Sequence, residues 1–152
     1  MKNIFIITTI LLISVLLIIF SYYKEDKAQG AKSYSSDLQL LARAINGEAR
    51  GESYEGQVAV GAVILNRVKH ADFPNTIAGV IYQTGAFTAV SDGQINVPID
   101  ENSTVFKAAQ DAMNGWDPTN GCIYYFNPDT ATSSWIWTKT IVKRIGKHNF
   151  CI

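Results

Sequence analysis

Several residues that could do acid–base chemistry lie close together in the segment Ile45–Glu52. The segment holds two carboxylates, one guanidinium and two glycines. Glycine allows sharp turns and lets a ligand approach the backbone. A carboxylic acid at a helix end, enclosed by apolar side chains, can act as a general acid near neutral pH. Glu48, Glu52 and Glu55 are therefore candidate acids, although most glutamates are solvated surface charges.

The flanking segments predict two helices that position these carboxylates. Apolar residues recur at helical spacing at Leu38, Leu41, Ala42 and Ile45. Gly47 is expected to end this helix, which leaves Glu48 where the chain departs from it. The length of the apolar run over residues 54–69 favours a second helix, with Ser53 or Glu52 as its cap. Glu52 and Glu55 then fall just before or inside that helix, where solvated charges are usual.

The middle of the chain predicts two further helices around an irregular segment. Asn75 is expected to cap a short helix over residues 76–82. Residues 85–98 are expected to be irregular or extended, with a turn at Asp92–Gly93. Asn102–Ser103 is expected to cap another helix, which ends at Gly115.

The last part of the chain predicts short strands. Residues 122–126, 134–137 and 140–145 are β-branched and aromatic, and turn residues separate them. Helices followed by strands are typical of an α+β domain. The fold class predicted here is therefore α+β, with a small aromatic-rich antiparallel sheet.

The N-terminal segment is strongly apolar. No charged residue occurs from Asn3 to Tyr23, and Ile4–Phe20 is almost wholly Ile, Leu, Val and Phe. This length is nearer the roughly 20 residues of a spanning helix than the about 7–15 of a secretory signal. We therefore predict a membrane anchor at residues 1–23, with a cleaved signal as the alternative. Residues 24–36 are polar and predict a linker, and residues 37–152 form the exported domain, anchored at the membrane or secreted to the wall.

Composition argues against several other functions. Lys and Arg total 13 and Asp and Glu total 13, so no bulk charge indicates nucleic acid. The two histidines and two cysteines lack zinc-like spacing, and there is no phosphate-binding glycine loop. We expect no metal and no cofactor. The sequence does not indicate an oligomeric state.

The two cysteines suggest a disulfide. Cys122 and Cys151 lie in the part expected to be exported, where disulfides persist. A bridge would close a loop of about thirty residues and contribute roughly 3–4 kcal/mol. Two buried free thiols are the alternative.

Aromatic residues crowd the strand region. They are Tyr124, Tyr125, Phe126, Trp135 and Trp137. Aromatic rings suit both cores and groove walls, because they bury a large area and several carry a polar tip. Exposed rings beside an acid suggest a cleft that binds sugars.

Several linked motifs resemble one family. Asn46–Glu52, Tyr54–Val60 and Val63–Val68 resemble the catalytic domain of the spore cortex-lytic and cell-wall hydrolase family, of the SleB/CwlJ type. Further matching segments follow in the family's order at Phe73–Ile77, Phe87–Gln94, Tyr125–Pro128, Trp135–Trp137 and Ile145–His148. Together they cover nearly all of residues 37–150.

The resemblance implies a lysozyme-like α+β fold and cleavage of the β-1,4 glycan strand of peptidoglycan. The bond would be the one between N-acetylmuramic acid and N-acetylglucosamine. Glu48 matches the family's catalytic acid, and the implied reaction is that of a lytic transglycosylase, with 1,6-anhydro-muramyl products. The implied role is cortex lysis during spore germination, or wall remodelling. Many relatives carry a separate peptidoglycan-binding domain. In this chain we predict a membrane anchor in place of that domain.

The candidate cleft residues are Phe87, Ser91, Asp92, Gln94, Tyr124, Tyr125, Asn127 and Trp135. For each of the polar ones, hydrogen bonding within a turn or at a strand end is an equally good interpretation. A hydrolase would more often need a second acid, for which Asp92 and Glu52 are the candidates. A membrane-anchored glycan-binding module without catalysis is the competing class. A structural or regulatory membrane protein would leave the clustered acids and tryptophans unexplained.

Overall fold

The computed structural model describes the backbone of residues 2–152 and the side chains from Leu11 onward. The chain divides into two compact units, residues 1–36 and 37–152. One helix, α1 (Lys2–Ala49), makes up the first unit and continues into the second. Each unit is described by itself.

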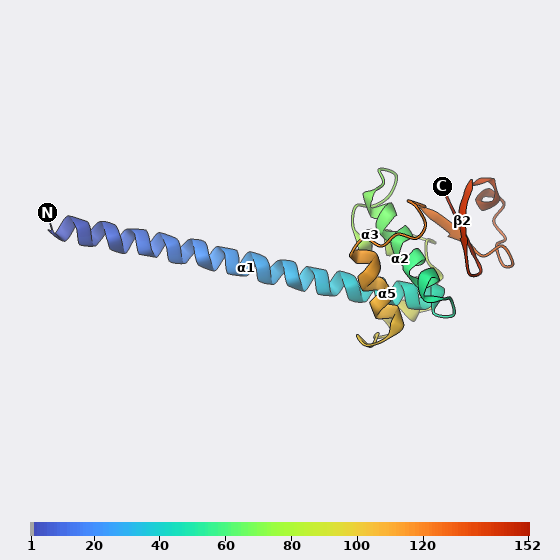
Figure 1. The fold of residues 1–152 in the computed structure, drawn as a ribbon, viewed down its shortest axis with the longest axis horizontal. Helices are drawn as coiled ribbons and strands as arrows, with labels where there is room; N and C mark the ends of the chain where they lie inside the picture. The colour runs from blue at the N-terminus through green and yellow to red at the C-terminus, as the bar shows by residue number, and fades with distance from the viewer. Residues whose placement is uncertain (1) are drawn as a thin grey trace. The chain divides into compact units, whose positions relative to one another are not determined.

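The first unit is helical throughout its described length (Figure 1). Residues 24–36, predicted to be a linker, are therefore helical. Ala, Lys, Glu and Gln in this stretch are good helix formers, and Gly30 costs only about 1 kcal/mol relative to Ala. Residues 24–36 are exposed. Their polar composition without apolar periodicity is therefore that of a helix surrounded by solvent.

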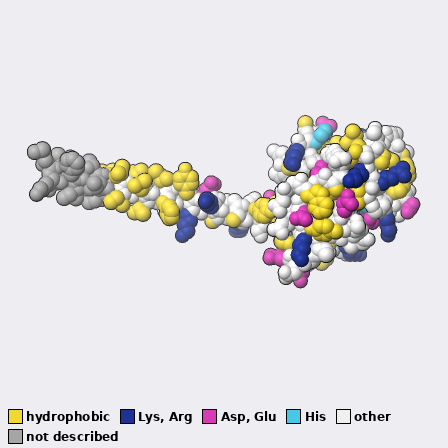
Figure 2. Space-filling model, in the orientation of Figure 1, with side chains coloured by type: hydrophobic (Ala, Val, Ile, Leu, Met, Phe, Trp, Pro, Cys, Tyr) yellow, Lys and Arg dark blue, Asp and Glu magenta, His cyan; other side chains and the backbone are white. Residues whose placement is uncertain are grey.

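The predicted membrane anchor is not supported. Exposed apolar side chains run along α1 from Leu11 to Tyr23 (Figure 2). Within the described residues, however, no helix is both long enough and apolar enough to cross a membrane. The rest of the predicted anchor, residues 1–10, lies outside the described side chains.

The second unit is an α+β domain, as predicted. Besides the end of α1, its helices are α2 (Tyr54–Lys69), α3 (Ile77–Ile81), α4 (Thr88–Ser91) and α5 (Thr104–Met113), with 3-10 turns η1 (Gln94–Asn96) and η2 (Ser134–Thr138). Its strands are β1 (Tyr124–Phe126), β2 (Ile141–Ile145) and β3 (His148–Cys151). On the face shown in Figure 2, acidic and basic side chains are interspersed over this unit.

The central element is α2. It packs against α3, α5, β1 and β2. Ser53 caps it by accepting a hydrogen bond from the Gly56 N–H at 3.2 Å. Its β-branched residues, such as Val58, Val60 and Ile64, are fully buried. Burial on several sides explains why a run with strand-like composition is helical, because packing overrides weak propensity.

The sheet has the order β1–β3–β2, and both pairings are antiparallel. Tyr125 of β1 lies opposite Phe150 of β3. Ile145 of β2 lies opposite His148, so a two-residue turn joins β2 to β3. Phe150 is fully buried at the centre of the core, together with Leu41, Ile45, Ile64 and Ile81.

Three local predictions differ from the structure. The segment over residues 85–98 contains the short helix α4 and the turn η1. Residues 134–137, expected to be a strand, form the exposed turn η2. The central strand β3 was not predicted.

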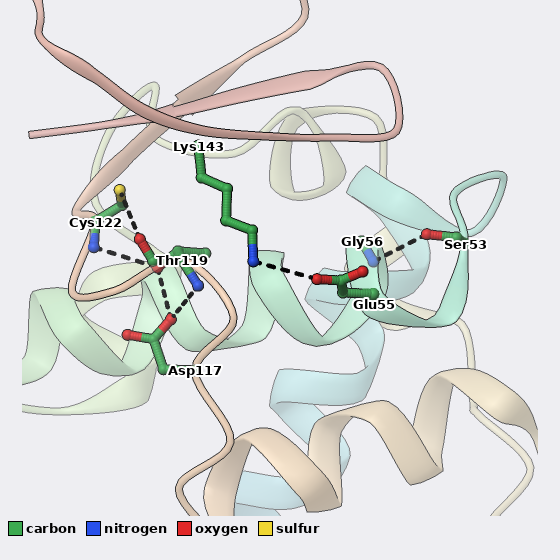
Figure 3. A network of polar contacts seen from close by, with 7 residues as sticks. All are labelled: Ser53, Glu55, Gly56, Asp117, Thr119, Cys122 and Lys143. Carbon is green, nitrogen blue, oxygen red and sulfur yellow. Dashed lines mark hydrogen bonds and ion pairs between the residues drawn. The ribbon is translucent and has the colours of Figure 1, made fainter.

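A polar network holds the loop before β1 (Figure 3). Asp117 accepts hydrogen bonds from the Thr119 N–H (2.8 Å), the Thr119 hydroxyl (2.6 Å), the Gly121 N–H (2.8 Å) and the Asn66 side-chain amide (2.9 Å). Asn66 also donates to the Cys122 carbonyl at 3.1 Å. Asn66 of α2 thus holds the chain that enters β1.

We expect Asp117→Asn to lower the free energy of unfolding by about 1–3 kcal/mol for each donor left unsatisfied, because an amide cannot accept from donors on both sides. Burial opposes ionisation of Asp117, but its hydrogen bonds outweigh burial and hold the pKa below the ordinary value of 3.8. The carboxylate therefore contributes stability above pH 3.8 that is lost as the pH falls further.

Urea unfolding of the wild type and Asp117→Asn between pH 3 and pH 7, with exposed Asp129→Asn as control, measures both effects. The variant should be less stable at pH 7 and lose less stability on acidification. Equal stability at pH 7 would contradict this role of Asp117.

The predicted disulfide is not formed in the structure. Cys122 and Cys151 are both buried and both free. The Cys122 thiol donates to the Thr119 carbonyl at 3.2 Å. Burial, with the neighbouring Cys122, raises the pKa of Cys151 to about 11. Both thiols therefore stay protonated at neutral pH.

Candidate active site

The side chain of Glu48 joins three elements of the second unit. It lies in the last turn of α1 and is partly buried. Its Oε1 accepts a hydrogen bond from the Ala89 N–H of α4 at 3.1 Å. Its Oε2 accepts one from the Tyr125 hydroxyl of β1 at 3.3 Å. Both carboxylate oxygens therefore have a fixed donor, and segments distant in sequence supply them.

Gly47 makes this arrangement possible. The prediction that Gly47 ends the helix is wrong, because α1 continues to Ala49. A Cβ at position 47 would overlap the Ala89 side chain and would lie 3.5 Å from the Cβ of Gln94. The absence of a side chain thus lets α4 approach α1 closely enough for the Ala89 N–H to reach Glu48.

Tyr125 is held in its protonated form. Burial, and then the negative charge of Glu48, hold the pKa of Tyr125 well above its usual range, although Arg67 acts in the opposite direction. The phenol therefore remains a hydrogen-bond donor toward Glu48 throughout the neutral range.

Arg67 is a buried cation behind this site, and sequence reasoning missed it. Its Nε donates to the Ile123 carbonyl at 2.7 Å. The guanidinium lies 5.2, 5.5 and 5.7 Å from the ring centroids of Phe73, Phe87 and Tyr124. Burial lowers the pKa of Arg67, and the acidic groups around it, first Tyr125 and also Glu48, partly offset this. Arg67 thus fixes the start of β1 and places a positive charge near the carboxylate.

Glu52 is not the solvated charge that its position predicts. Its side chain is 8% exposed, and its Oε2 accepts a hydrogen bond from the Lys147 N–H at 3.0 Å. Glu55 does follow the expectation, since it is half exposed and lies 3.4 Å from Lys143 (Figure 3). The two acids therefore differ in role: Glu52 holds the turn between β2 and β3.

His148 is a second residue that sequence reasoning did not place in the site. Its ring lies 5.3 Å from the Tyr125 ring, nearly perpendicular to it at 82°. Its Nδ1 is buried without a hydrogen-bond partner, 3.9 Å from Glu52 Oε1. Burial lowers the pKa of His148, although the charges of Glu52 and Glu48 oppose this, so the ring is neutral at pH 7. The sequence feature that could have indicated His148 is its place in the family motif Ile145–His148.

Three polar candidates make local hydrogen bonds. Ser91 donates to the Thr88 carbonyl at 2.9 Å, which lies within α4. Asp92 accepts from the Gln94 N–H at 3.0 Å, and Asn127 accepts from the Asp129 N–H at 2.9 Å. These contacts match the turn interpretation of Ser91, Asp92 and Asn127.

Gln94 lies next to the last turn of α1. Its Cβ is 3.5 Å from the position that a Cβ on Gly47 would take. Its Oε1 accepts a hydrogen bond from Arg50 Nη1 at 3.2 Å. Gln94 therefore connects η1 to the end of the Ile45–Glu52 segment.

The aromatic candidates separate into core and surface. Phe87 is buried at 4% exposure and belongs to the core. Trp135 is half exposed, and its ring meets that of Tyr124 edge to face at 5.1 Å. Lys139 Nζ lies 4.5 Å from the Tyr124 ring centroid and 5.1 Å from that of Trp135. Trp135 and Tyr124 thus form an aromatic surface. Tyr124 precedes Tyr125 in the chain.

Comparison with known proteins identifies the family. Residues 51–151 match the model of the Cell Wall Hydrolase family. The chain belongs to this family. The resemblance noted in the sequence is thereby confirmed.

Relatives within the cell wall hydrolase family carry two names. A spore cortex-lytic enzyme of Bacillus cereus is 63% identical over 116 residues, which are 76% of this chain and 44% of that protein. One of Bacillus subtilis strain 168 is 60% identical over 117 residues, or 77% of this chain and 38% of that protein. The cell wall hydrolase CwlJ of the same strain is 31% identical over 126 residues, covering 78% of this chain and 87% of CwlJ. The chain thus spans less than half the length of the spore cortex-lytic enzymes.

Two solved structures share the fold. The catalytic domain of the Bacillus cereus SleB protein is 62% identical with a TM-score of 0.73, covering 78% of this chain and 91% of that one. The catalytic domain of the germination-specific lytic transglycosylase SleB from Bacillus anthracis is also 62% identical with a TM-score of 0.73, covering 76% and 93%. The helix-rich α+β fold with a small antiparallel sheet is therefore that of a SleB catalytic domain.

Among the described residues, no group of three or more His, Cys, Asp or Glu side chains is placed to hold a metal ion.

Proposed function

We propose that this cell wall hydrolase cleaves the β-1,4 bond between N-acetylmuramic acid and N-acetylglucosamine in peptidoglycan as a lytic transglycosylase. The observation that carries the proposal is the single carboxylate of Glu48, held by an N–H from α4 and a hydroxyl from β1. The SleB relative from Bacillus anthracis, which is named a lytic transglycosylase, supports the reaction type.

One carboxyl group is sufficient for this chemistry. Protonated Glu48 gives its proton to the bridging oxygen as the bond from that oxygen to the anomeric carbon breaks. The resulting carboxylate takes the proton of the muramyl C6 hydroxyl, whose oxygen then bonds to the anomeric carbon. The Ala89 N–H and the Tyr125 hydroxyl stabilise the carboxylate between the two proton transfers, because hydrogen bonds to an ionised acceptor are strong.

The contacts of the other acids favour this route over hydrolysis. A hydrolase more often uses a second carboxylate to activate water or to attack the sugar. Of the two candidates, Glu52 is bound to the Lys147 N–H and Asp92 to the Gln94 N–H. Each of these bonds lies within or against a turn, whereas the Glu48 carboxylate is held between α4 and β1, so we propose Glu48 as both the acid and the base.

The proposed biological substrate is spore cortex peptidoglycan, and the proposed role is its degradation during germination. The names of the spore cortex-lytic enzymes support this proposal. Such a role places the chain outside the cytoplasmic membrane. We also propose that the fold is related to that of lysozyme, with Glu48 at the corresponding acid position. Wall remodelling is the alternative role, as the name of CwlJ indicates.

A turbidity assay tests the proposed activity. We expect the purified chain to lower the turbidity of isolated spore cortex and to release soluble glycan fragments. A glycan-binding module without catalysis would bind the cortex and leave its turbidity constant. Constant turbidity with both cortex and vegetative peptidoglycan would contradict the proposed function.

We expect Tyr125→Phe to lower kcat by roughly tenfold, the low end of the range for a hydrogen bond to a charged group, because the bond is long at 3.3 Å. KM and the melting temperature should change little, since the ring remains. Steady-state rates on soluble glycan strands measure the effect, with Tyr82→Phe at an exposed tyrosine as control. Equal rates for Tyr125→Phe and the wild type would contradict a role for the hydroxyl.

A further inference from the structure

Two buried polar residues beside the site, Glu52 and His148, have no part in the proton transfers proposed above. Their side chains are 8% and 11% exposed. Burying a carboxylate and an imidazole is costly unless their contacts compensate, so their position needs an explanation.

Glu52 determines the geometry of the turn between β2 and β3. Its Oε2 accepts the Lys147 N–H at 3.0 Å. Gly146 has a left-handed φ of 57°, and a Cβ there would overlap Glu52 Oε2. The carboxylate therefore lies directly against the turn backbone, and that turn delivers His148 as the first residue of β3.

His148 transmits this position to Tyr125 by packing. Its ring meets the Tyr125 ring at 82° with 5.3 Å between centroids. The Phe150 ring packs against both, with its centroid 5.9 Å from that of Tyr125 and 6.3 Å from that of His148. The His148 Nδ1 makes no hydrogen bond, so the histidine acts here through its ring and not through a bonded nitrogen.

The last contact is the hydrogen bond from the Tyr125 hydroxyl to Glu48 Oε2. A continuous series of contacts thus runs from Glu52 through the turn, His148 and Tyr125 to Glu48. We propose that Glu52 and His148 are positioning residues that hold the Tyr125 hydroxyl against the Glu48 carboxylate. The inference rests on the proposed function, since it assigns the pair a role in the reaction of Glu48.

A double-mutant cycle on kcat tests this role. We expect His148→Ala to lower kcat about tenfold, within the range for residues in contact, with KM nearly unchanged. In a Tyr125→Phe background the same change should lower kcat less than about twofold, because no hydroxyl remains to be positioned. An equal loss in both backgrounds would overturn the proposal. His70→Ala, at a partly exposed histidine, is the control.

Glu52 gives a second, independent cycle, which also decides the matter if His148→Ala does not fold. Glu52→Ala should lower kcat, and this loss should disappear in the Tyr125→Phe background. Glu52→Gln should keep near wild-type kcat, because the amide oxygen still accepts the Lys147 N–H. A loss in Glu52→Gln as large as that in Glu48→Gln would make Glu52 a catalytic carboxylate and overturn the positioning role.

These outcomes are distinct from a failure of the proposed function. If the wild type does not cleave peptidoglycan, the proposed function is wrong. If the wild type cleaves it and the cycles are additive, only the positioning role is wrong. Glu55→Ala, which removes a half-exposed acid three residues after Glu52, should leave kcat unchanged in every background.

Discussion

Glu48→Gln is expected to lower the rate of peptidoglycan cleavage by roughly 10²–10⁴-fold, the usual contribution of general acid–base catalysis. The glutamine amide has the same shape, and its oxygen can still accept the Ala89 N–H that binds Glu48 Oε1. The Tyr125 hydroxyl can rotate to accept from the amide nitrogen, so the fold should persist. The amide cannot give a proton to the glycosidic oxygen.

Matched variants isolate the effect to position 48. Glu52→Gln and Glu55→Gln remove the same charge from neighbouring acids and should lose much less activity. Rates are measured on soluble glycan strands, with circular dichroism to verify folding. A folded Glu48→Gln variant with full activity would contradict the proposed mechanism.

Gly47→Ala is the second change with a large expected effect. On helix propensity alone it would stabilise α1 by about 1 kcal/mol. In the structure the new methyl group would overlap the Ala89 side chain, and such overpacking costs about 1–3 kcal/mol. Because α4 must then move away from α1, the Ala89 N–H leaves Glu48. We expect a small net loss of stability and a rate loss of up to about 10²-fold.

Gly51→Ala is the control for this prediction, since a Cβ at position 51 would have no atom within 4 Å. Thermal melts and cleavage rates of both variants are compared with the wild type. If Gly47→Ala gains stability and keeps its rate, then α4 does not need to approach α1 this closely.

Helices of the second unit were predictable because their signals are local. The run from Tyr54 to Lys69 has helical length and a serine cap, and the structure has α2 with these bounds. Ser103 caps α5 by accepting the Phe106 N–H at 3.2 Å, as the Asn102–Ser103 pair predicts. Capping and length depend on residues within one or two turns of each other.

The strand β3 and the turn η2 were not predictable in the same way. β3 contains His148 and Asn149 and has no alternating pattern, and it is a strand because β1 and β2 pair with it on both sides. Trp135 and Trp137 have high strand propensity, but no strand pairs with their segment, and it forms an exposed 3-10 turn. Pairing partners distant in sequence decided both cases.

Within the site, the sequence indicated Glu48 but not what surrounds it. The contact of Glu48 with Tyr125 spans 77 positions in the chain, and that with Ala89 spans 41. The residues next to Glu52 in sequence predict a solvated acid. Glu52 is buried because the turn between β2 and β3, distant in sequence, packs against it. Arg67 lies within the helix α2, and an arginine in a helix is usually exposed, so its burial could not be predicted.

The mass of the released glycan ends distinguishes the proposed lytic transglycosylase from a hydrolase. Soluble fragments produced by the wild-type chain from purified cortex are analysed by mass spectrometry without prior reduction. We expect muramyl ends about 18 Da lighter than a reducing end, because the C6 hydroxyl replaces water as the nucleophile. Reducing muramic acid ends would contradict this expectation, and would show that a water molecule and a second carboxylate complete the reaction.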